Sequence, residues 1–367
     1  MRMDFNWYLG ICLFMLYPIV IYFIGKIKNI NVDKIVLMIC CACLCFFSAF
    51  RDISVGTDTA NYCYYFQQIR KMTFSELFCK KIYLIGGYPG KAEIGYRIYN
   101  WILGNFFKSD SMIIIFNSIF IFFLLYMVIE SLSLNPLLSI WLYITLGIFQ
   151  TQLNLERNAI AILLGYYSFQ FIKEKKLIKY ICIIVIASLF HTTAILFIPL
   201  YWLTNYIKLD IKRALGFIAC ASFVGINISL FIGFIRKIVP SNYIEYIYLS
   251  NDDKSAILVG IFNLFLLILI YVFADNKKVF LDDQVGMVMF LLNMVCFGLS
   301  IGIGGMTRVA ALFGPYFIIY LPNAIESQKS KNKRILLFVV VIGICLVEYI
   351  LRLKINNIGG TMPYKFR

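Results

Sequence analysis

Charge is scarce in this sequence, and histidine occurs once. Only 14% of the 367 residues are charged, whereas 61% are apolar. Soluble domains contain about 25% charged and about 45–50% apolar residues, and a water-soluble fold of the present composition would expose large apolar patches. The shortage of charge therefore excludes an ordinary soluble protein. It predicts an all-α, polytopic membrane protein, because continuous apolar runs satisfy their backbone groups in lipid as helices.

Motifs for nucleotides and nucleic acids are missing. The chain has neither a P-loop nor a GxGxxG fingerprint, which excludes the common soluble nucleotide sites. Basic residues outnumber acidic residues by 34 to 19 and give a net charge of +15, but short basic loops in a membrane protein signal topology. No basic run carries a recognisable DNA or RNA module. We therefore expect no nucleic-acid partner.

The cysteines are interpreted as packing residues. There are eleven, and most lie in apolar runs, where a free cysteine behaves as a small apolar side chain. Cys63 and Cys79 lie outside these runs, and a disulfide between them is an open alternative. We expect no bound metal and no cofactor. Four cysteines crowd a single run: Cys40, Cys41, Cys43 and Cys45.

Long apolar runs follow one another along the chain. Each approaches the roughly 20 residues that a helix needs to cross the hydrocarbon core. We expect about eleven membrane helices, including short or broken ones, in a single integral membrane domain of residues 1–367. The expected spans are 5–25, 35–50, 111–132, 136–153, 155–172, 177–204, 214–235, 256–274, 285–303, 307–325 and 335–351.

Four short basic loops set the orientation of these spans. By the positive-inside rule the loops are cytoplasmic, so residues 51–110 form an extracytoplasmic loop with amphipathic helices. Within it, residues 93–107 are too short for a span and read as an interfacial helix with Glu93, Arg97, Asn100 and Gly104 on one polar face. The basic loops are 26–34, 173–179, 208–213 and 326–334.

The run 177–204 contains His191 and can be read in two ways. A single long helix would place the basic loop 208–213 outside. Two short helices that meet near His191 keep that loop inside and are preferred. Short paired segments also indicate irregular backbone, which membranes tolerate around a protein-lined cavity.

Six ionisable residues from five separate segments converge on the outer side under this topology. Charges in the membrane are costly and are therefore functional candidates. Arginines bind phosphates as planar bidentate clamps, and histidine can take a proton from a hydroxyl near neutral pH. A diphosphate leaving group displaced by a sugar hydroxyl needs both. The six are Arg51, Asp58, Glu93, Arg157, His191 and Arg308.

Each candidate also has a structural explanation. Arg157 and Arg308 could lie at helix ends and reach the interface, and Asp58 could cap a helix. Glu93 could pair with Arg97 four residues on, and His191 could be a hydrogen-bonded core residue.

Several sequence blocks, in order and spacing, resemble the EpsG-like family of bacterial exopolysaccharide and O-antigen polymerases of the Wzy type. The resemblance covers most of the chain and implies a GT-C-like membrane glycosyltransferase that works without nucleotide sugars. The blocks are "FRDISVGTDTANY" (50–62), "EIGY" (93–96), "LERNAIA" (155–161), "IASLFHTTAILFIPL" (186–200), "TRVAALFGPYFIIYLP" (307–322) and "PYKF" (363–366).

The resemblance implies a reaction on the outer face of the bacterial plasma membrane. A growing glycan on undecaprenyl diphosphate would be the donor, and a lipid-linked repeat unit the acceptor, with inversion at the anomeric centre. His191, Arg157 and Arg308 would be catalytic. A chain-length regulator is a further candidate partner beside the membrane lipids. The substrate-binding residues would be Arg51, Asp58, Tyr62, Glu93 and Tyr96.

Two other functions fit parts of the pattern. An O-antigen ligase-like transferase would use the same donor with another acceptor. A flippase or transporter of lipid-linked oligosaccharide would predict internal repeats and charges in both leaflets. The sequence has no internal repeat, and its charged candidates gather on one side.

Overall fold

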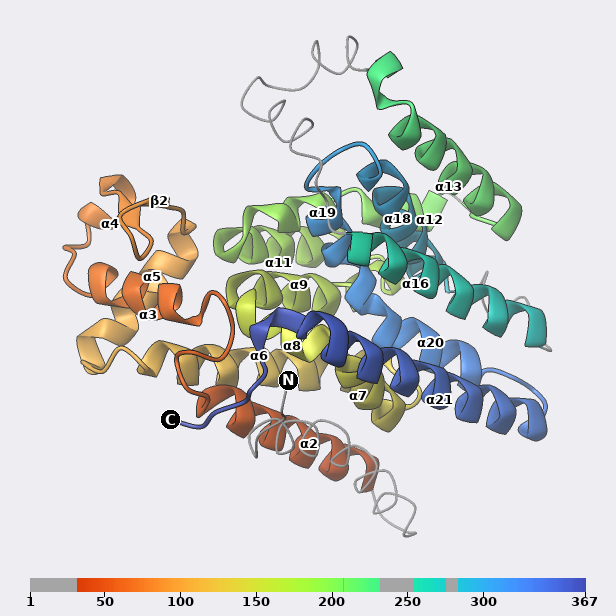
Figure 1. Ribbon diagram of the computed structural model, residues 1–367, viewed down its shortest axis with the longest axis horizontal. Coiled ribbons are helices and arrows are strands. Elements are labelled where there is room, and N and C mark those ends of the chain that lie inside the picture. Colours follow the sequence, from red (N-terminus) through yellow and green to blue (C-terminus); the bar gives the residue numbers. More distant parts are fainter. Residues whose placement is uncertain (1–31, 207, 232–253, 275–282) are drawn as a thin grey trace. The chain divides into compact units, whose positions relative to one another are not determined.

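The computed structural model describes residues 32–206, 208–231, 254–274 and 283–367, and this part of the chain is mostly helical (Figure 1). The described strands are β1 (Ile82–Tyr83) and β2 (Pro89–Gly90), which pair antiparallel. The chain divides into two compact units. Unit 1 holds the described residues up to Ile198 together with Ile342–Arg367, and unit 2 is Pro199–Val341.

Four helices form a row in unit 1. α11 packs on α9, α9 on α6, and α6 on α2, so the spatial order differs from the chain order (Figure 1). Their buried faces are apolar, as in α6, where Ile121, Leu125 and Val128 are buried. The row is built from α2 (Val32–Ala49), α6 (Met112–Leu132), α9 (Glu156–Ser168) and α11 (Leu177–Phe190).

Short helices complete unit 1, and several begin or end at a recognisable signal. Asn135 caps α7 by accepting a hydrogen bond from the Leu138 backbone N–H at 3.0 Å, and Pro136 occupies the first helical position. Gly147, at φ +70°, separates α7 from α8, and the two helices meet at 62°. The elements are α7 (Pro136–Thr145), α8 (Ile148–Asn154), α10 (Gln170–Lys173), η1 (Thr192–Phe197) and η3 (Ile358–Gly360).

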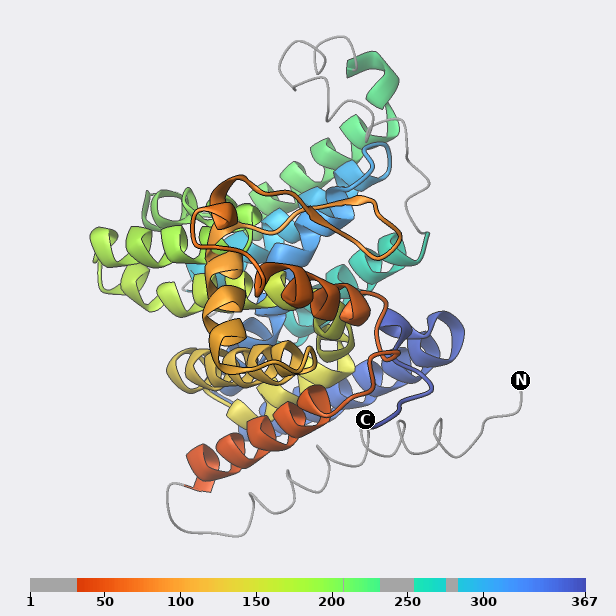
Figure 2. The ribbon, with the colours of Figure 1, turned by 90° about the vertical axis from the view of Figure 1, so that its left-hand side faces the viewer.

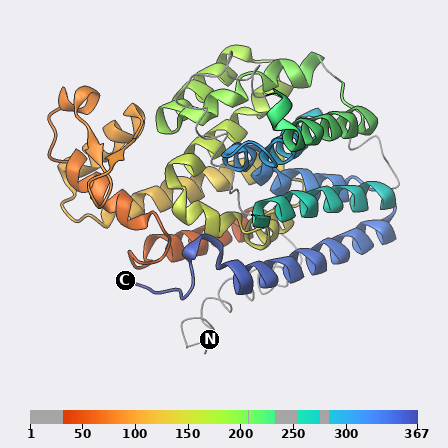
Figure 3. The same cartoon turned by 45° about the horizontal axis from the view of Figure 1, so that its top comes forward.

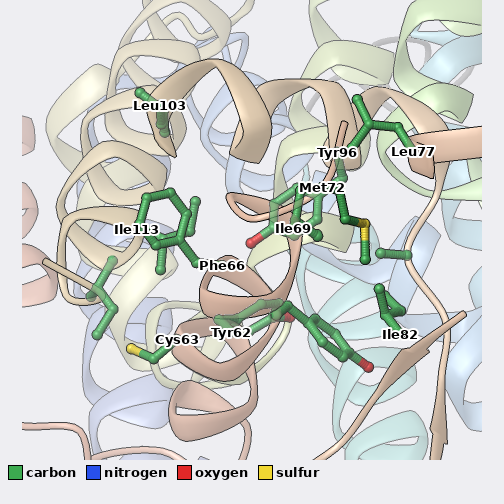
Figure 4. Close-up of a cluster of buried hydrophobic side chains, with 13 residues drawn as sticks. Tyr62, Cys63, Phe66, Ile69, Met72, Leu77, Ile82, Tyr96, Leu103 and Ile113 are labelled. Carbon is green, nitrogen blue, oxygen red and sulfur yellow. The ribbon is translucent and has the colours of Figure 1, made fainter. Parts of the chain in front are cut away.

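The segment 51–110 covers one end of this row (Figure 2). Within it, α3 packs on α5, α3 also packs on α6, and α5 packs on α11. Figure 4 shows the core of this segment, where Phe66, Ile69 and Tyr96 are fully buried. Its helices are α3 (Thr59–Ile69), α4 (Glu76–Cys79) and α5 (Ile94–Phe106).

The polar face predicted for residues 93–107 turns inward. Asn100 is fully buried, and its side-chain amide donates to the Tyr96 carbonyl at 2.7 Å. Arg97 does not pair with Glu93; its guanidinium donates to the backbone carbonyls of Leu77 and Ala92 at 3.0 and 2.9 Å. Backbone carbonyls of the preceding loop therefore form hydrogen bonds with this face. The helix α5 is packed within unit 1 on its polar side.

Unit 2 is organised around α18, which packs against α12, α13, α16 and α19 (Figure 3). Gly225 and Gly298 allow α13 and α18 to approach closely, because a Cβ at Gly225 would lie 2.2 Å from the Gly298 carbonyl oxygen. The elements are α12 (Leu200–Tyr206), α13 (Ile211–Ile226), α16 (Lys254–Phe273), α18 (Gln284–Ser300), α19 (Met306–Phe313), η2 (Gly314–Tyr316) and α20 (Phe317–Glu326), and α21 (Lys331–Asn356) runs on into unit 1.

The helices expose large apolar side chains, as a membrane-embedded protein does. Ile178, Val185 and Ile186 of α11 are exposed on its outer face. Within the described residues, three helices are long and apolar enough to cross a membrane: Met112–Leu132, Met306–Glu326 and Lys331–Leu353. The bent pair α7–α8 makes a fourth if it counts as one span.

The prediction of about eleven membrane helices is therefore not established by helix length. Breaks at Gly147 and His191 divide expected spans into shorter pieces, and several apolar helices, such as α11, are too short to cross alone. The expected span 5–25 lies outside the described residues, as does the end of 214–235. The run 177–204 is broken at His191, as the preferred two-helix interpretation predicts.

Candidate functional site

An ion pair joins two of the predicted site residues across unit 1. Arg157, the second residue of α9, places its Nη1 atom 2.7 Å from Oε2 of Glu93, which immediately precedes α5. The two side chains are 17% and 8% exposed. Nε of Arg157 has no hydrogen-bond partner among the described residues. One donor of the guanidinium is thus engaged by Glu93, and another is buried without a partner.

Aromatic rings surround this guanidinium. Its Cζ lies 5.6 Å from the Tyr96 ring centroid and 5.9 Å from that of Tyr65, which are cation–π distances. Tyr62 packs edge-on against Tyr96, and its hydroxyl donates to the Asn154 carbonyl at 3.0 Å. Burial raises the pKa of Tyr62, Tyr65 and Tyr96, so all three are neutral phenols at physiological pH.

The single histidine stands at the break between α11 and η1. Its backbone is extended, at φ −153° and ψ 122°, which ends one helix and caps the next. Nδ1 lies 2.7 Å from Oγ1 of Thr193, and that hydroxyl donates to Oδ1 of Asn158 at 3.5 Å. Glu93 reaches the same loop, because its Oε1 accepts the Thr192 backbone N–H at 3.4 Å. Glu93 thereby joins Arg157 to the histidine loop.

The contacts of Nδ1 determine what the histidine can do. When Nδ1–H donates to the Thr193 hydroxyl, the neutral ring keeps a lone pair on Nε2 and can accept a proton. When Nδ1 instead accepts the Thr193 backbone N–H, at 3.4 Å, the proton is on Nε2 and the ring is a donor. A hydroxyl has one hydrogen, so when Thr193 donates it to Asn158 its oxygen can only accept from Nδ1–H, which corresponds to the first arrangement.

Arg51 is buried and pairs with Glu156, the residue that directly precedes Arg157. Its side chain has no exposed surface, and it forms an ion pair with Glu156, whose side chain is 2% exposed. It also donates to the Leu153 carbonyl at 3.1 Å and to the Ser48 carbonyl at 2.5 Å. These contacts tie α2 to α8 and α9 through a single side chain.

Asp58 lies at the start of α3, in the loop that follows Arg51. It occupies the N-cap position, but its side chain makes no capping hydrogen bond. The loop is held by Asn154, whose Oδ1 accepts the Thr57 N–H at 2.6 Å and whose Nδ2 donates to the Gly359 carbonyl at 2.6 Å. Gly56 has φ +93°, which other residues rarely adopt. The loop therefore leads into α3 without a capping hydrogen bond from the Asp58 side chain.

The tail of the chain pairs with the residues around Arg51. Arg51 and Phe366 form an isolated antiparallel bridge. The Asp52 N–H donates to the Lys365 carbonyl at 2.9 Å, and the Tyr364 hydroxyl donates to the Phe47 carbonyl. The block "PYKF" is therefore part of the frame of unit 1.

Arg308 belongs to unit 2 and is described within that unit. It is the third residue of α19 and is exposed. Gly305, at φ +83°, precedes the helix, in a position that favours glycine.

Sequence reasoning missed four polar residues that support the cluster. Three of them lie in the quoted blocks, where a neighbouring charged residue or histidine is the stronger signal, and the fourth, Asn117, lies in the apolar run 111–132. Among the described residues, no three histidine, cysteine, aspartate or glutamate side chains gather as metal ligands would. Cys63 and Cys79 are both free thiols, the first buried and the second exposed. The four missed residues are Asn117, Glu156, Asn158 and Thr193.

Fold and cluster together define a helical membrane protein in which a guanidinium, a carboxylate, an imidazole loop and aromatic rings meet in one unit. Residues 34–366 match the model of the EpsG family, and the chain belongs to that family. Membership points to a membrane glycosyltransferase-like protein of the polysaccharide polymerase type that uses lipid-linked oligosaccharides. No curated protein and no solved structure matches the chain.

Proposed function

We propose that the protein is a polysaccharide polymerase of the bacterial plasma membrane. It transfers a growing glycan from undecaprenyl diphosphate to a lipid-linked repeat unit on the outer face, within a GT-C-like fold. Family membership supports the reaction type. The single observation that carries the site assignment is the Arg157–Glu93–Thr192 connection, which joins a phosphate-type guanidinium to the loop of the only histidine.

The proposed step is a direct displacement. A hydroxyl oxygen of the acceptor sugar attacks the anomeric carbon of the donor, and the bond from that carbon to the diphosphate oxygen breaks. The hydroxyl proton passes to Nε2 of His191. Attack from the face opposite the leaving group inverts the anomeric centre.

Arg157 receives the charge that develops on the leaving diphosphate. Electrostatic stabilisation of a leaving group is strongest when donors are already in place in a water-poor environment, and the rings of Tyr65 and Tyr96 hold this guanidinium in position. Arg308, on α19 of unit 2, is proposed as a further catalytic arginine on the resemblance of its sequence block alone.

The remaining residues are assigned to the sugars and to the frame. Asp58 and Glu93 position sugar hydroxyls. Tyr96 is fully buried and Tyr62 is 5% exposed, so these two rings act indirectly, Tyr96 by packing against the Arg157 guanidinium and Tyr62 by packing against Tyr96. Arg51 acts indirectly, because its buried guanidinium is engaged by Glu156 and by backbone carbonyls.

The test is polymer formation in cells that carry His191→Ala or Arg157→Ala. Long-chain polymer should disappear while single lipid-linked repeat units persist. Lys176→Ala is the matched control, because Lys176 pairs with its neighbour Glu174 at an exposed site. Normal chain-length ladders in both site variants would end the assignment. Polymer that forms but stays on its lipid would instead indicate a ligase.

A further inference from the structure

We infer that Glu156 and Asn117 are positioning residues for Arg157 and Tyr96. The inference deepens the proposed function and rests on it. It assigns roles to two buried residues that would touch neither substrate.

Both carboxylate oxygens of Glu156 are engaged. Oε1 pairs with Arg51, and Oε2 accepts a hydrogen bond from Nδ2 of Asn117 at 2.5 Å. Glu156 is the first residue of α9, directly before Arg157. Fixing its side chain therefore fixes the backbone from which the Arg157 side chain starts.

The network returns to Arg157 by a second route. Nδ2 of Asn117 also donates to the Tyr96 hydroxyl at 3.1 Å. The Tyr96 ring in turn lies against the Arg157 guanidinium, 5.6 Å from centroid to Cζ. One amide thus restrains both the origin of the arginine side chain and the ring beside its charged end.

Stability alone does not explain the arrangement. A buried ion pair contributes little more than an apolar pair of the same volume. Hydrogen bonds, unlike apolar contacts, are directional. Glu156 can hold Asn117 in one orientation, and Asn117 can hold the Tyr96 ring, in a way that two apolar side chains cannot.

The experiment compares Asn117→Leu with Ser118→Ala in purified protein. Ser118 is the adjacent buried polar residue on α6; its hydroxyl bonds to the Ser48 hydroxyl and to the Ile114 carbonyl, both at 2.7 Å. For Asn117→Leu we expect kcat to fall about 10-fold, within the coupling range of contacting residues. Binding of added undecaprenyl diphosphate should weaken by a similar factor. Ser118→Ala should stay within about 2-fold in both.

A second variant covers the case in which Asn117→Leu fails to fold. Tyr96→Phe removes only the hydroxyl that Asn117 holds and leaves the ring beside the Arg157 guanidinium. Tyr96→Phe should lower kcat about 10-fold with a smaller change in KM, because it also removes a single contact between neighbouring residues, the hydrogen bond from Asn117. Wild-type kcat and wild-type binding in either folded variant would overturn the inference.

The outcomes separate this inference from the proposed function. Polymerisation by the wild type with unaffected Asn117→Leu and Tyr96→Phe contradicts the positioning role alone. A wild type that neither polymerises nor binds undecaprenyl diphosphate contradicts both. A wild type that binds but does not polymerise contradicts the polymerase assignment, and the binding comparison still decides the positioning role.

Discussion

Arg157 and Glu93 hold each other at 2.7 Å, although they lie 64 residues apart in the chain. A diphosphate that approaches Arg157 must therefore compete with a carboxylate that already occupies one of its donors. The same carboxylate touches the histidine loop through Thr192. Binding of the lipid-linked diphosphate would then separate Glu93 from Arg157 and move the Glu93 carboxylate closer to the sugars.

Glu93→Gln tests this competition. The amide keeps an acceptor for the Thr192 N–H but no longer neutralises Arg157. We expect undecaprenyl diphosphate to bind about 5-fold more tightly, a gain of about 1 kcal/mol, while polymerisation slows. A thermal-shift titration measures the affinity. Unchanged or weaker binding contradicts the competition.

Arg157→Lys tests the planar guanidinium. Lysine keeps the charge, but it loses the fork that grips a diphosphate and the flat surface that packs on Tyr96. We expect polymerisation to fall at least about 10-fold, which corresponds to about 1.4 kcal/mol, with protein amount in the membrane maintained. Initial rates with a defined lipid-linked repeat unit provide the measurement. A fully active lysine variant would show that only a positive charge is needed.

Thr193→Val tests the histidine contact. Valine is close in shape but cannot accept from Nδ1, so the ring loses the partner that favours a lone pair on Nε2. We expect kcat to fall about 10-fold or more, since general-base catalysis supplies about 10²–10⁴. Thr192→Val is the control, because Thr192 contacts Glu93 through its backbone N–H, which valine retains. Equal kcat in the two variants would contradict the role of Thr193.

Arg51→Met tests the buried ion pair. It strands the Glu156 carboxylate in the core, which costs about 3–5 kcal/mol of unfolding free energy. Adding Glu156→Met removes the unpaired charge and should restore most of this loss. Thermal unfolding in detergent compares the two. A double variant less stable than the single would show that Glu156 is compensated by another group.

The location of residues 51–110 can be tested with thiol chemistry. Cys79 is exposed, whereas Cys63 is buried, and burial raises the pKa of the Cys63 thiol to about 12. A raised pKa keeps Cys63 protonated and unreactive through neutral pH. A membrane-impermeant maleimide should therefore label the protein in cells with an intact plasma membrane, and Cys79→Ser should abolish labelling of this segment. Labelling of Cys79 only after lysis would place the segment inside.

Local patterns predict the features that depend on a few neighbouring residues. The helix break at His191 follows from the length of the run and the charge of the loop after it, and the structure shows it. The free thiols and the helical class also agree with reading the apolar runs as packed helices.

Features that depend on distant partners are not predictable in this way. Glu93 has Arg97 four residues away, yet it pairs with Arg157. The guanidinium of Arg97 instead donates hydrogen bonds to backbone carbonyls of the loop before α5. The resemblance assigns Arg51 to the substrate, but its partner Glu156 lies 105 residues along the chain. Nothing local in the sequence distinguishes a buried carboxylate from an exposed one.

Glu156 and Arg157 are adjacent residues of opposite charge, and their side chains leave the first turn of α9 on different sides. The first turns into the interior and the second toward the tyrosines. Exchanging the two letters would preserve length, composition, hydropathy and net charge, yet it would bring a second cation against Arg51 and leave an anion among the rings. The role of this block therefore depends on the order of its residues. Composition, hydropathy and net charge could identify a membrane protein, but they could not locate its site residues.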